Sequence, residues 1–211
     1  MDLTSIGQQT ASNWCSDPDN SDDDSDNYDV RSDGTIVVNL GDDDVERAHT
    51  LARERNRSYL SGATTDDNWS EGKSGGDIHV QGLLAEIAME IVYGVPVDES
   101  ISAVGDGGID GELETIDGET LAYDIKSREY DGPGAALLAK KDNVDIREEH
   151  PDVYIASYVD VDNRTVHIDG WLHYDEFVDE SNIAEAKADW LDHINYEAPI
   201  GQLNEPWVPD N

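Results

Sequence analysis

The segment between residues 109 and 126 constrains the fold most, because it has the pattern of a β-hairpin. Its second half carries large apolar side chains at every other position, namely Leu121, Tyr123 and Ile125. A turn signal, Asp117-Gly118, separates this half from a first strand that follows a pair of glycines. Since side chains two apart on a strand share a face, we expect Asp124 and Lys126 to lie together on the face opposite the apolar set.

Further helices and strands are predicted on both sides of this hairpin. The apolar periodicity predicts strands at 35–40, 101–104, 135–139, 153–159 and 165–171, and helices at 42–60, 81–93, 174–179 and 183–194. In the helix at 81–93 an apolar stripe recurs at helical spacing, and Gly94 follows as an end signal. This mixture predicts an α/β fold.

Acidic residues dominate the composition. Aspartate and glutamate outnumber lysine and arginine by 49 to 13 in the 211 residues, which gives a formal net charge of −36. Residues 1–34 are polar and rich in aspartate, so we expect a disordered acidic tail there and one folded domain at 35–211. At about 1 M salt the Debye length is about 3 Å, which screens such self-repulsion. The composition therefore indicates a halophilic source, archaeal or viral.

Cys15 is the sole cysteine, so neither an intrachain disulfide nor a zinc site built on several cysteines can form. The N-terminus lacks a basic stretch followed by an apolar one, and no apolar run reaches about 18 residues. We expect a cytoplasmic protein without a membrane partner.

The carboxylates of the hairpin suit the hydrolysis of a phosphodiester. A divalent metal held by carboxylates supplies a nucleophilic water and compensates charge on the phosphate. Asp110 and Asp124, on adjacent strands, are the natural ligands, and Lys126 can orient the attacking water. Glu86 lies at the edge of the apolar stripe of its helix and offers a third carboxylate. An acid two residues before a lysine also occurs at Glu71 and Glu185, but only at Asp124 does the pair lie in a strand pattern.

Three motifs in this order resemble the PD-(D/E)XK superfamily, the restriction-endonuclease-like nucleases. They are Gly-Leu-Leu-Ala-Glu at 82–86, Gly-Gly-Ile-Asp at 107–110 and Asp-Ile-Lys at 124–126. Ile109 replaces the proline of the family name, which is often missing in the family. The strand at 152–155 and the Ile-Asp-Gly-Trp segment at 168–171 are similar to those of small phage and archaeal members.

The resemblance implies a restriction-endonuclease-like core, in which helices flank a central mixed β-sheet, and makes 35–211 a nuclease-like domain. It implies metal-dependent cleavage of DNA phosphodiesters, as an endonuclease, with Mg²⁺ or Mn²⁺ as cofactor. The catalytic residues would be Glu86, Asp110, Asp124 and Lys126, the first three as metal ligands.

DNA is the expected partner, and a second copy of the chain is a further candidate. We expect Arg128, Lys140 and Lys141 to bind the nucleic acid and, together with Lys126 and Arg147, to cluster beside the site. Two non-catalytic alternatives remain open. One is an acidic protein that imitates the DNA backbone, and the other is a binding protein on an inactive nuclease fold.

Overall fold

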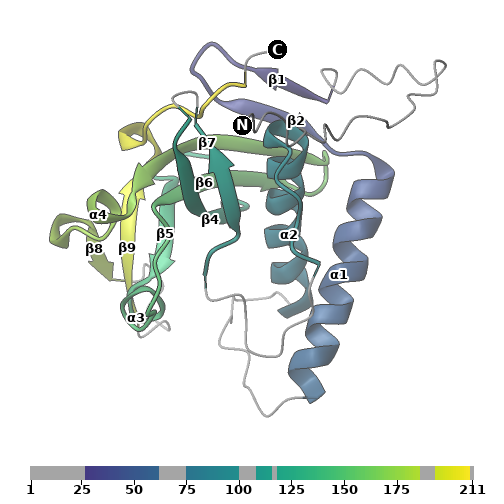
Figure 1. The fold of residues 1–211 in the computed structure, drawn as a ribbon, viewed down its shortest axis with the longest axis horizontal. Helices are drawn as coiled ribbons and strands as arrows, with labels where there is room; N and C mark the ends of the chain where they lie inside the picture. Colours follow the sequence, from purple (N-terminus) through teal and green to yellow (C-terminus); the bar gives the residue numbers. More distant parts are fainter. Residues whose placement is uncertain (1–26, 62–74, 100–107, 116–117, 186–192, 210–211) are drawn as a thin grey trace, which may run out of the picture.

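The computed structural model describes residues 27–61, 75–99, 108–115, 118–185 and 193–209, and its main feature is a mixed six-stranded β-sheet (Figure 1). The strand order is β1-β2-β7-β6-β4-β3. In chain order these strands are β1 (Tyr28–Val30), β2 (Ile36–Asn39), β3 (Gly111–Glu114), β4 (Thr120–Arg128), β6 (Val153–Asp160) and β7 (Thr165–His173). The neighbours β4 and β6 run parallel, and the other pairs are antiparallel. The prediction of an α/β fold with a mixed sheet is confirmed.

Two long helices lie on one side of this sheet. They are α1 (Asp42–Ser61) and α2 (Gly75–Tyr93), which lie side by side in Figure 1. Helix α2 packs against the strands, and α1 packs against α2. One core cluster joins α1 and α2 to the alternate residues of β4 that the sequence pattern singled out, namely Leu121, Tyr123 and Ile125.

A second, three-stranded sheet covers the opposite face. Its order is β5-β9-β8, with β5 (Ala136–Lys140), β9 (Ile194–Pro199) and β8 (Ile183–Glu185) all antiparallel. The short helices α3 (Lys141–Asp145) and α4 (Tyr174–Phe177) lie on the same side, and two 3₁₀ turns cover 180–182 and 200–202. Because β6 is buried on both faces, it reads as a nearly continuous apolar run, with Val153 and Ile155 in one core and Tyr154 and Ala156 in the other.

Most predicted strands are confirmed, and the hairpin pairs Gly111 with Tyr123 and Glu114 with Thr120. The helix expected at 81–93 begins earlier, at Gly75, so residues 75–77 are not loop. It ends as predicted, since Gly94 has φ of +69° and its N–H donates to the carbonyl of Glu90 at 2.9 Å.

The helix predicted at 183–194 is wrong at both of its ends. Residues 183–185 form β8, and Ile194 begins β9, so that Ile183 pairs with Tyr196. The pairing of both segments into one sheet outweighs their helical spacing, because the tertiary partners satisfy the backbone groups. Residues 186–192 and the strand predicted at 101–104 lie outside the described residues.

The ordered sheet begins inside the stretch assigned to the acidic tail. β1 pairs with β2 at Tyr28–Val38 and Val30–Ile36, so the folded part includes residues from Asn27 onward. Residues 1–26, on which the prediction of disorder mainly falls, lie outside the described residues. None of the described helices combines the length and apolarity that a membrane-spanning helix needs.

Candidate active site

The loop before β3 holds Asp110 against strand β4. The backbone N–H of Asp110 donates to the carbonyl of Tyr123 at 2.8 Å, and its Oδ2 accepts the N–H of Ile125 at 2.7 Å. These two contacts bracket Asp124 along the strand. The hairpin therefore brings the Asp110 carboxylate beside the backbone of Asp124, as the sequence predicted.

Gly111 permits this close approach. A β-carbon at this position would lie 2.9 Å from both the Tyr123 hydroxyl and Val95 Cγ1. Real β-carbons do not approach other atoms so closely, so a side chain here would push the Tyr123 ring or the hairpin backbone aside. The glycine after Asp110 therefore allows the start of β3 to pack closely against Tyr123 and Val95.

Asp124 is the most deeply buried of the predicted catalytic carboxylates, with 1% of its surface exposed. Its Oδ2 accepts from Arg147 Nη1 at 2.8 Å, and its Oδ1 lies 2.5 Å from Lys126 Nζ. The Lys126 contact is an ion pair without hydrogen-bond geometry, so Oδ1 has no directed hydrogen bond from the described residues. Asp124 and Lys126 share one face of β4, as predicted.

Arg147 reaches Asp124 from the segment between α3 and β6. Its Nη1 also donates to the carbonyl of Gly108 at 3.3 Å. Gly108 has φ of +85°, and a β-carbon there would lie 1.9 Å from Arg147 Cζ, so the guanidinium occupies the space that a side chain would fill. The sequence pattern placed Arg147 only among the five cations that follow the hairpin, and nothing local in the sequence shows that it pairs with Asp124.

Glu86 lies on α2 and is held by a different cation. Its carboxylate is 3.4 Å from Arg55 Nη1, with 13% of the Glu86 side chain exposed, and Arg55 Nη2 donates to the carbonyl of Asp98 at 2.5 Å. Burial raises the pKa of Tyr123, and the charges of Asp110 and Glu86 raise it further. Both carboxylates are therefore within electrostatic range of the Tyr123 phenol.

Asp124 points to the face of the sheet opposite the helices. Burial raises the pKa of the Tyr154 phenol, and the charge of Asp124 adds to this shift while Arg147 opposes it. Tyr154 belongs to the core under the small sheet. Asp110, Asp124 and Lys126 thus lie along one section of β4, whereas Glu86 is held on α2, over the face opposite the one to which Asp124 points.

The proposed metal ligands do not form a ready-made cage. Within the described residues, no group of three or more His, Cys, Asp or Glu side chains is arranged to hold a metal ion. Mg²⁺ keeps several waters and needs one or two carboxylates. The buried Oδ1 of Asp124, which lacks a directed hydrogen bond, and the adjacent Asp110 fit that need. The three-ligand set of Glu86, Asp110 and Asp124 stays a prediction.

The five cations predicted to cluster beside the site are divided in the structure. Lys126 and Arg147 contact Asp124, but Arg128 Nη1 pairs with Asp169 at 2.6 Å and Lys141 pairs with Asp145. Lys140 is half-buried at the end of β5. Neutralised in this way, Arg128 and Lys141 add little positive potential around Asp124, which weakens the electrostatic argument for DNA.

The arginines of α1 serve the fold as well. Arg47 lies 2.8 Å from Glu99 and also pairs with Glu90 on α2, which raises the pKa of Arg47. Together with the Arg55–Glu86 contact, this ties α1 to α2 and to the chain after it. Arg47 and Arg55 are therefore engaged in ion pairs between elements of the fold.

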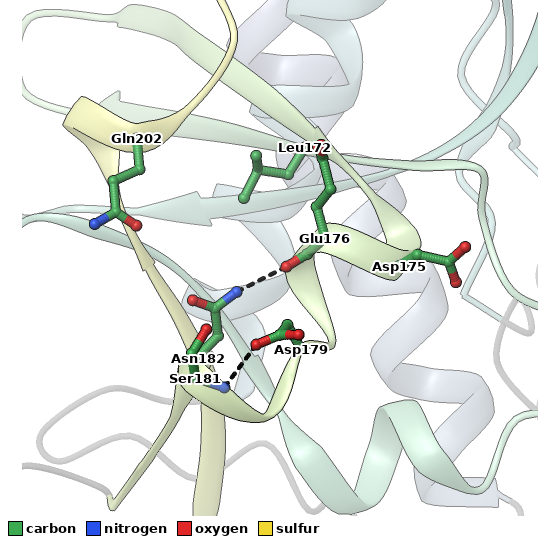
Figure 2. A pocket seen from close by; sticks show the side chains of 7 residues that line it. All are labelled: Leu172, Asp175, Glu176, Asp179, Ser181, Asn182 and Gln202. Carbon is green, nitrogen blue, oxygen red and sulfur yellow. Dashed lines mark hydrogen bonds between the residues drawn. The ribbon is translucent and has the colours of Figure 1, made fainter.

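A separate open pocket lies beside α4 and the 3₁₀ turn that follows it (Figure 2). Asp179 accepts the N–H of Ser181 at 2.8 Å, which lowers the pKa of Asp179, and Asn182 Nδ2 donates to the carbonyl of Glu176 at 2.8 Å. These polar groups form the turn itself. None of the predicted site residues lines this pocket in the described part of the chain.

Comparisons with known proteins do not add a family. No protein-family model matches the chain, and neither a curated protein nor a solved structure matches it.

Proposed function

We propose that the chain is a metal-dependent nuclease that hydrolyses DNA phosphodiester bonds as an endonuclease. One observation carries this proposal: a buried carboxylate, Asp124, contacts a lysine two residues away, and the carboxylate of Asp110 accepts the backbone N–H of the next residue, Ile125. Buried charges need compensating partners, and groups of such charges are found preferentially at functional sites.

Each of these side chains has a distinct part in the proposed reaction. Asp110 and Asp124 would hold Mg²⁺ or Mn²⁺. When bound, the ion would supply an activated water and stabilise charge on the phosphate. The Lys126 side chain is 29% exposed, with Nζ 2.5 Å from Asp124 Oδ1, and it would orient that water and face the phosphate from solvent.

The arrangement of elements supports the restriction-endonuclease-like core that the motifs imply. Helix α2 with Glu86, the β3–β4 hairpin with the other three residues, and a parallel strand β6 follow in that order. The sheet is mixed, and its neighbouring layers are α1 and α2 on one face and the small sheet on the other.

A Lys126→Met variant tests the proposal directly. Wild-type protein in about 1 M KCl with Mg²⁺ or Mn²⁺ should cleave plasmid, linear or branched DNA, and Lys126→Met should lose about 10²-fold or more of that rate, as expected for a group that positions a proton transfer. The control is Arg164→Gln, which removes an exposed cation paired with Asp42 and should leave the rate unchanged. Equal activity in Lys126→Met and wild type would contradict the assignment.

A specific observation favours a second candidate, a non-catalytic protein on an inactive nuclease fold. Both Asp124 and Glu86 are already engaged by arginines, and the chain is strongly acidic. Such a protein, or an acidic DNA mimic, would occupy a DNA-binding partner without cutting. An inert wild type that prevents another enzyme from binding DNA would establish this candidate in place of the nuclease.

A further inference from the structure

We propose that Arg147 is a removable counter-ion, which neutralises Asp124 while the site is free of metal and leaves when a divalent cation binds. This inference rests on the proposed function, because it concerns the same carboxylate. It adds a built-in competition between a side chain and the metal, so that Arg147 sets the cation concentration at which the site fills.

The burial of Asp124 makes such a counter-ion necessary. A carboxylate that is 1% exposed is strongly destabilised unless charged partners replace its water. Lys126 lies close to Oδ1 but without hydrogen-bond geometry, whereas Arg147 donates to Oδ2 at 2.8 Å. Arg147 is therefore the better-directed partner of Asp124 in the metal-free protein.

The local charge balance shows why Arg147 and a metal exclude each other. Asp110 and Asp124 carry two negative charges, which Lys126 and Arg147 balance with two positive ones. A divalent cation on the carboxylates would add two positive charges within a few ångströms, and like charges at that distance repel strongly in a partly buried site. Departure of Arg147 relieves this excess and leaves one net positive charge, which suits a phosphodiester anion.

The surroundings of Arg147 allow it to leave. Its side chain is 22% exposed, and it reaches the site from a connecting segment, not from the sheet. The guanidinium rests in a notch that exists because Gly108 has no side chain. Filling that notch should therefore expel the guanidinium while every charge in the protein is kept.

Gly108→Ala provides this test, and Gly134→Ala is its matched control. Both glycines have nearly the same positive φ, +85° and +88°, so alanine strains both backbones alike. A β-carbon at Gly108 would lie 1.9 Å from Arg147 Cζ, whereas at Gly134 it would meet nothing within 4 Å. Arg147→Met is a second variant, which removes the guanidinium outright.

The measurement is Mn²⁺ binding by calorimetry, without DNA, in about 1 M KCl, with folding checked by circular dichroism. We expect Gly108→Ala and Arg147→Met to bind Mn²⁺ about tenfold or more tightly than wild type, Gly134→Ala to match wild type, and Asp124→Asn to lose binding. Binding by Arg147→Met alone, with none by wild type, also supports the inference.

Two results would overturn it in distinguishable ways. If wild type binds Mn²⁺ through Asp124 but Arg147→Met binds no more tightly, the competition is refuted and the proposed nuclease stands. If neither wild type nor any variant binds Mn²⁺, the metal-dependent function fails together with the inference. Gly108→Ala changes no charge, so tighter binding by this variant cannot be assigned to a change in overall charge, whereas Arg147→Met removes one positive charge.

Discussion

Replacing Asp124 by asparagine tests its proposed catalytic role separately from its structural one, because a second aspartate, Asp169, also has a largely covered side chain that pairs with an arginine. Asp124 and Asp169 are 1% and 8% exposed at their side chains, and each pairs with an arginine, at 2.8 and 2.6 Å. Of the two, Asp124 is the one that contacts Lys126 and whose strand neighbour Ile125 donates to Asp110. Asp169→Asn is therefore the matched control for Asp124→Asn.

The expected losses of stability are similar for the two variants. Removing one partner of a charged, buried hydrogen bond costs about 1–3 kcal/mol, and the arginines are 22% and 12% exposed, so they can partly regain water. Burial raises the pKa of Asp169, so its charged form is held less favourably and its loss should fall at the low end of that range. In a domain of this size each kcal/mol lowers Tm by about 2–4 °C.

The expected effects on activity differ widely. A metal ligand supports transition-state charge by several kcal/mol, so Asp124→Asn should reduce the cleavage rate about 10³-fold or more. Asp169→Asn should stay within about threefold of wild type. The assay is single-turnover nicking of plasmid DNA with Mn²⁺, beside thermal unfolding of the same samples. Equal cleavage rates for Asp124→Asn and Asp169→Asn would refute the assignment of Asp124 as a metal ligand.

Three further predictions concern packing, pH and salt. Gly111→Ala should lower the free energy of unfolding by about 1–3 kcal/mol, because its β-carbon would meet Tyr123 and Val95 at 2.9 Å. Gly82→Ala, in the middle of α2, should raise the free energy of unfolding by about 0.5–1 kcal/mol, because a β-carbon there meets nothing within 4 Å. Urea titrations measure both changes. Burial lowers the pKa of His167 from 6.5, so as the pH falls the imidazole is protonated in the unfolded chain before it is protonated in the folded one. The free energy of unfolding should therefore decline below pH 6.5 in wild type, and decline less in His167→Gln. The free energy of unfolding should rise between about 0.1 and 1 M KCl as salt screens the net charge of −36, and a flat dependence would contradict the halophilic interpretation.

The sequence predicted what local patterns determine. The β3–β4 hairpin follows from strict alternation and a turn signal, so the joint face of Asp124 and Lys126 and the position of Asp110 could be inferred. The end of α2 at Gly94 is equally local. Each of these features depends on residues within one element or on immediate neighbours in the chain.

Contacts between distant segments could not be inferred in this way. The sheet of β5, β9 and β8 joins segments far apart in sequence. The spacing of apolar residues at 183–194 predicted a helix and did not indicate these strands. Arg147 lies 23 residues beyond Asp124, and its pairing depends on a notch at Gly108 that sequence alone does not display. Likewise, Glu86 was expected to reach the sheet end, but α1 supplies Arg55 to hold it.

The net charge of the chain decides less about DNA binding than the arrangement of charges around β4. At about 1 M salt, interactions between exposed charges are largely screened beyond about 3 Å. The acidic surface then repels a phosphate only weakly, and a distant basic patch attracts a phosphate only weakly as well. Arg128 and Lys141 are neutralised by their own acidic partners. Of the five cations that follow the hairpin, Lys126 would face a phosphate at this site, joined by Arg147 if a cation displaces its guanidinium from Asp124. Affinity for DNA would therefore be created by metal binding and would not precede it, which reconciles a strongly acidic protein with an anionic substrate.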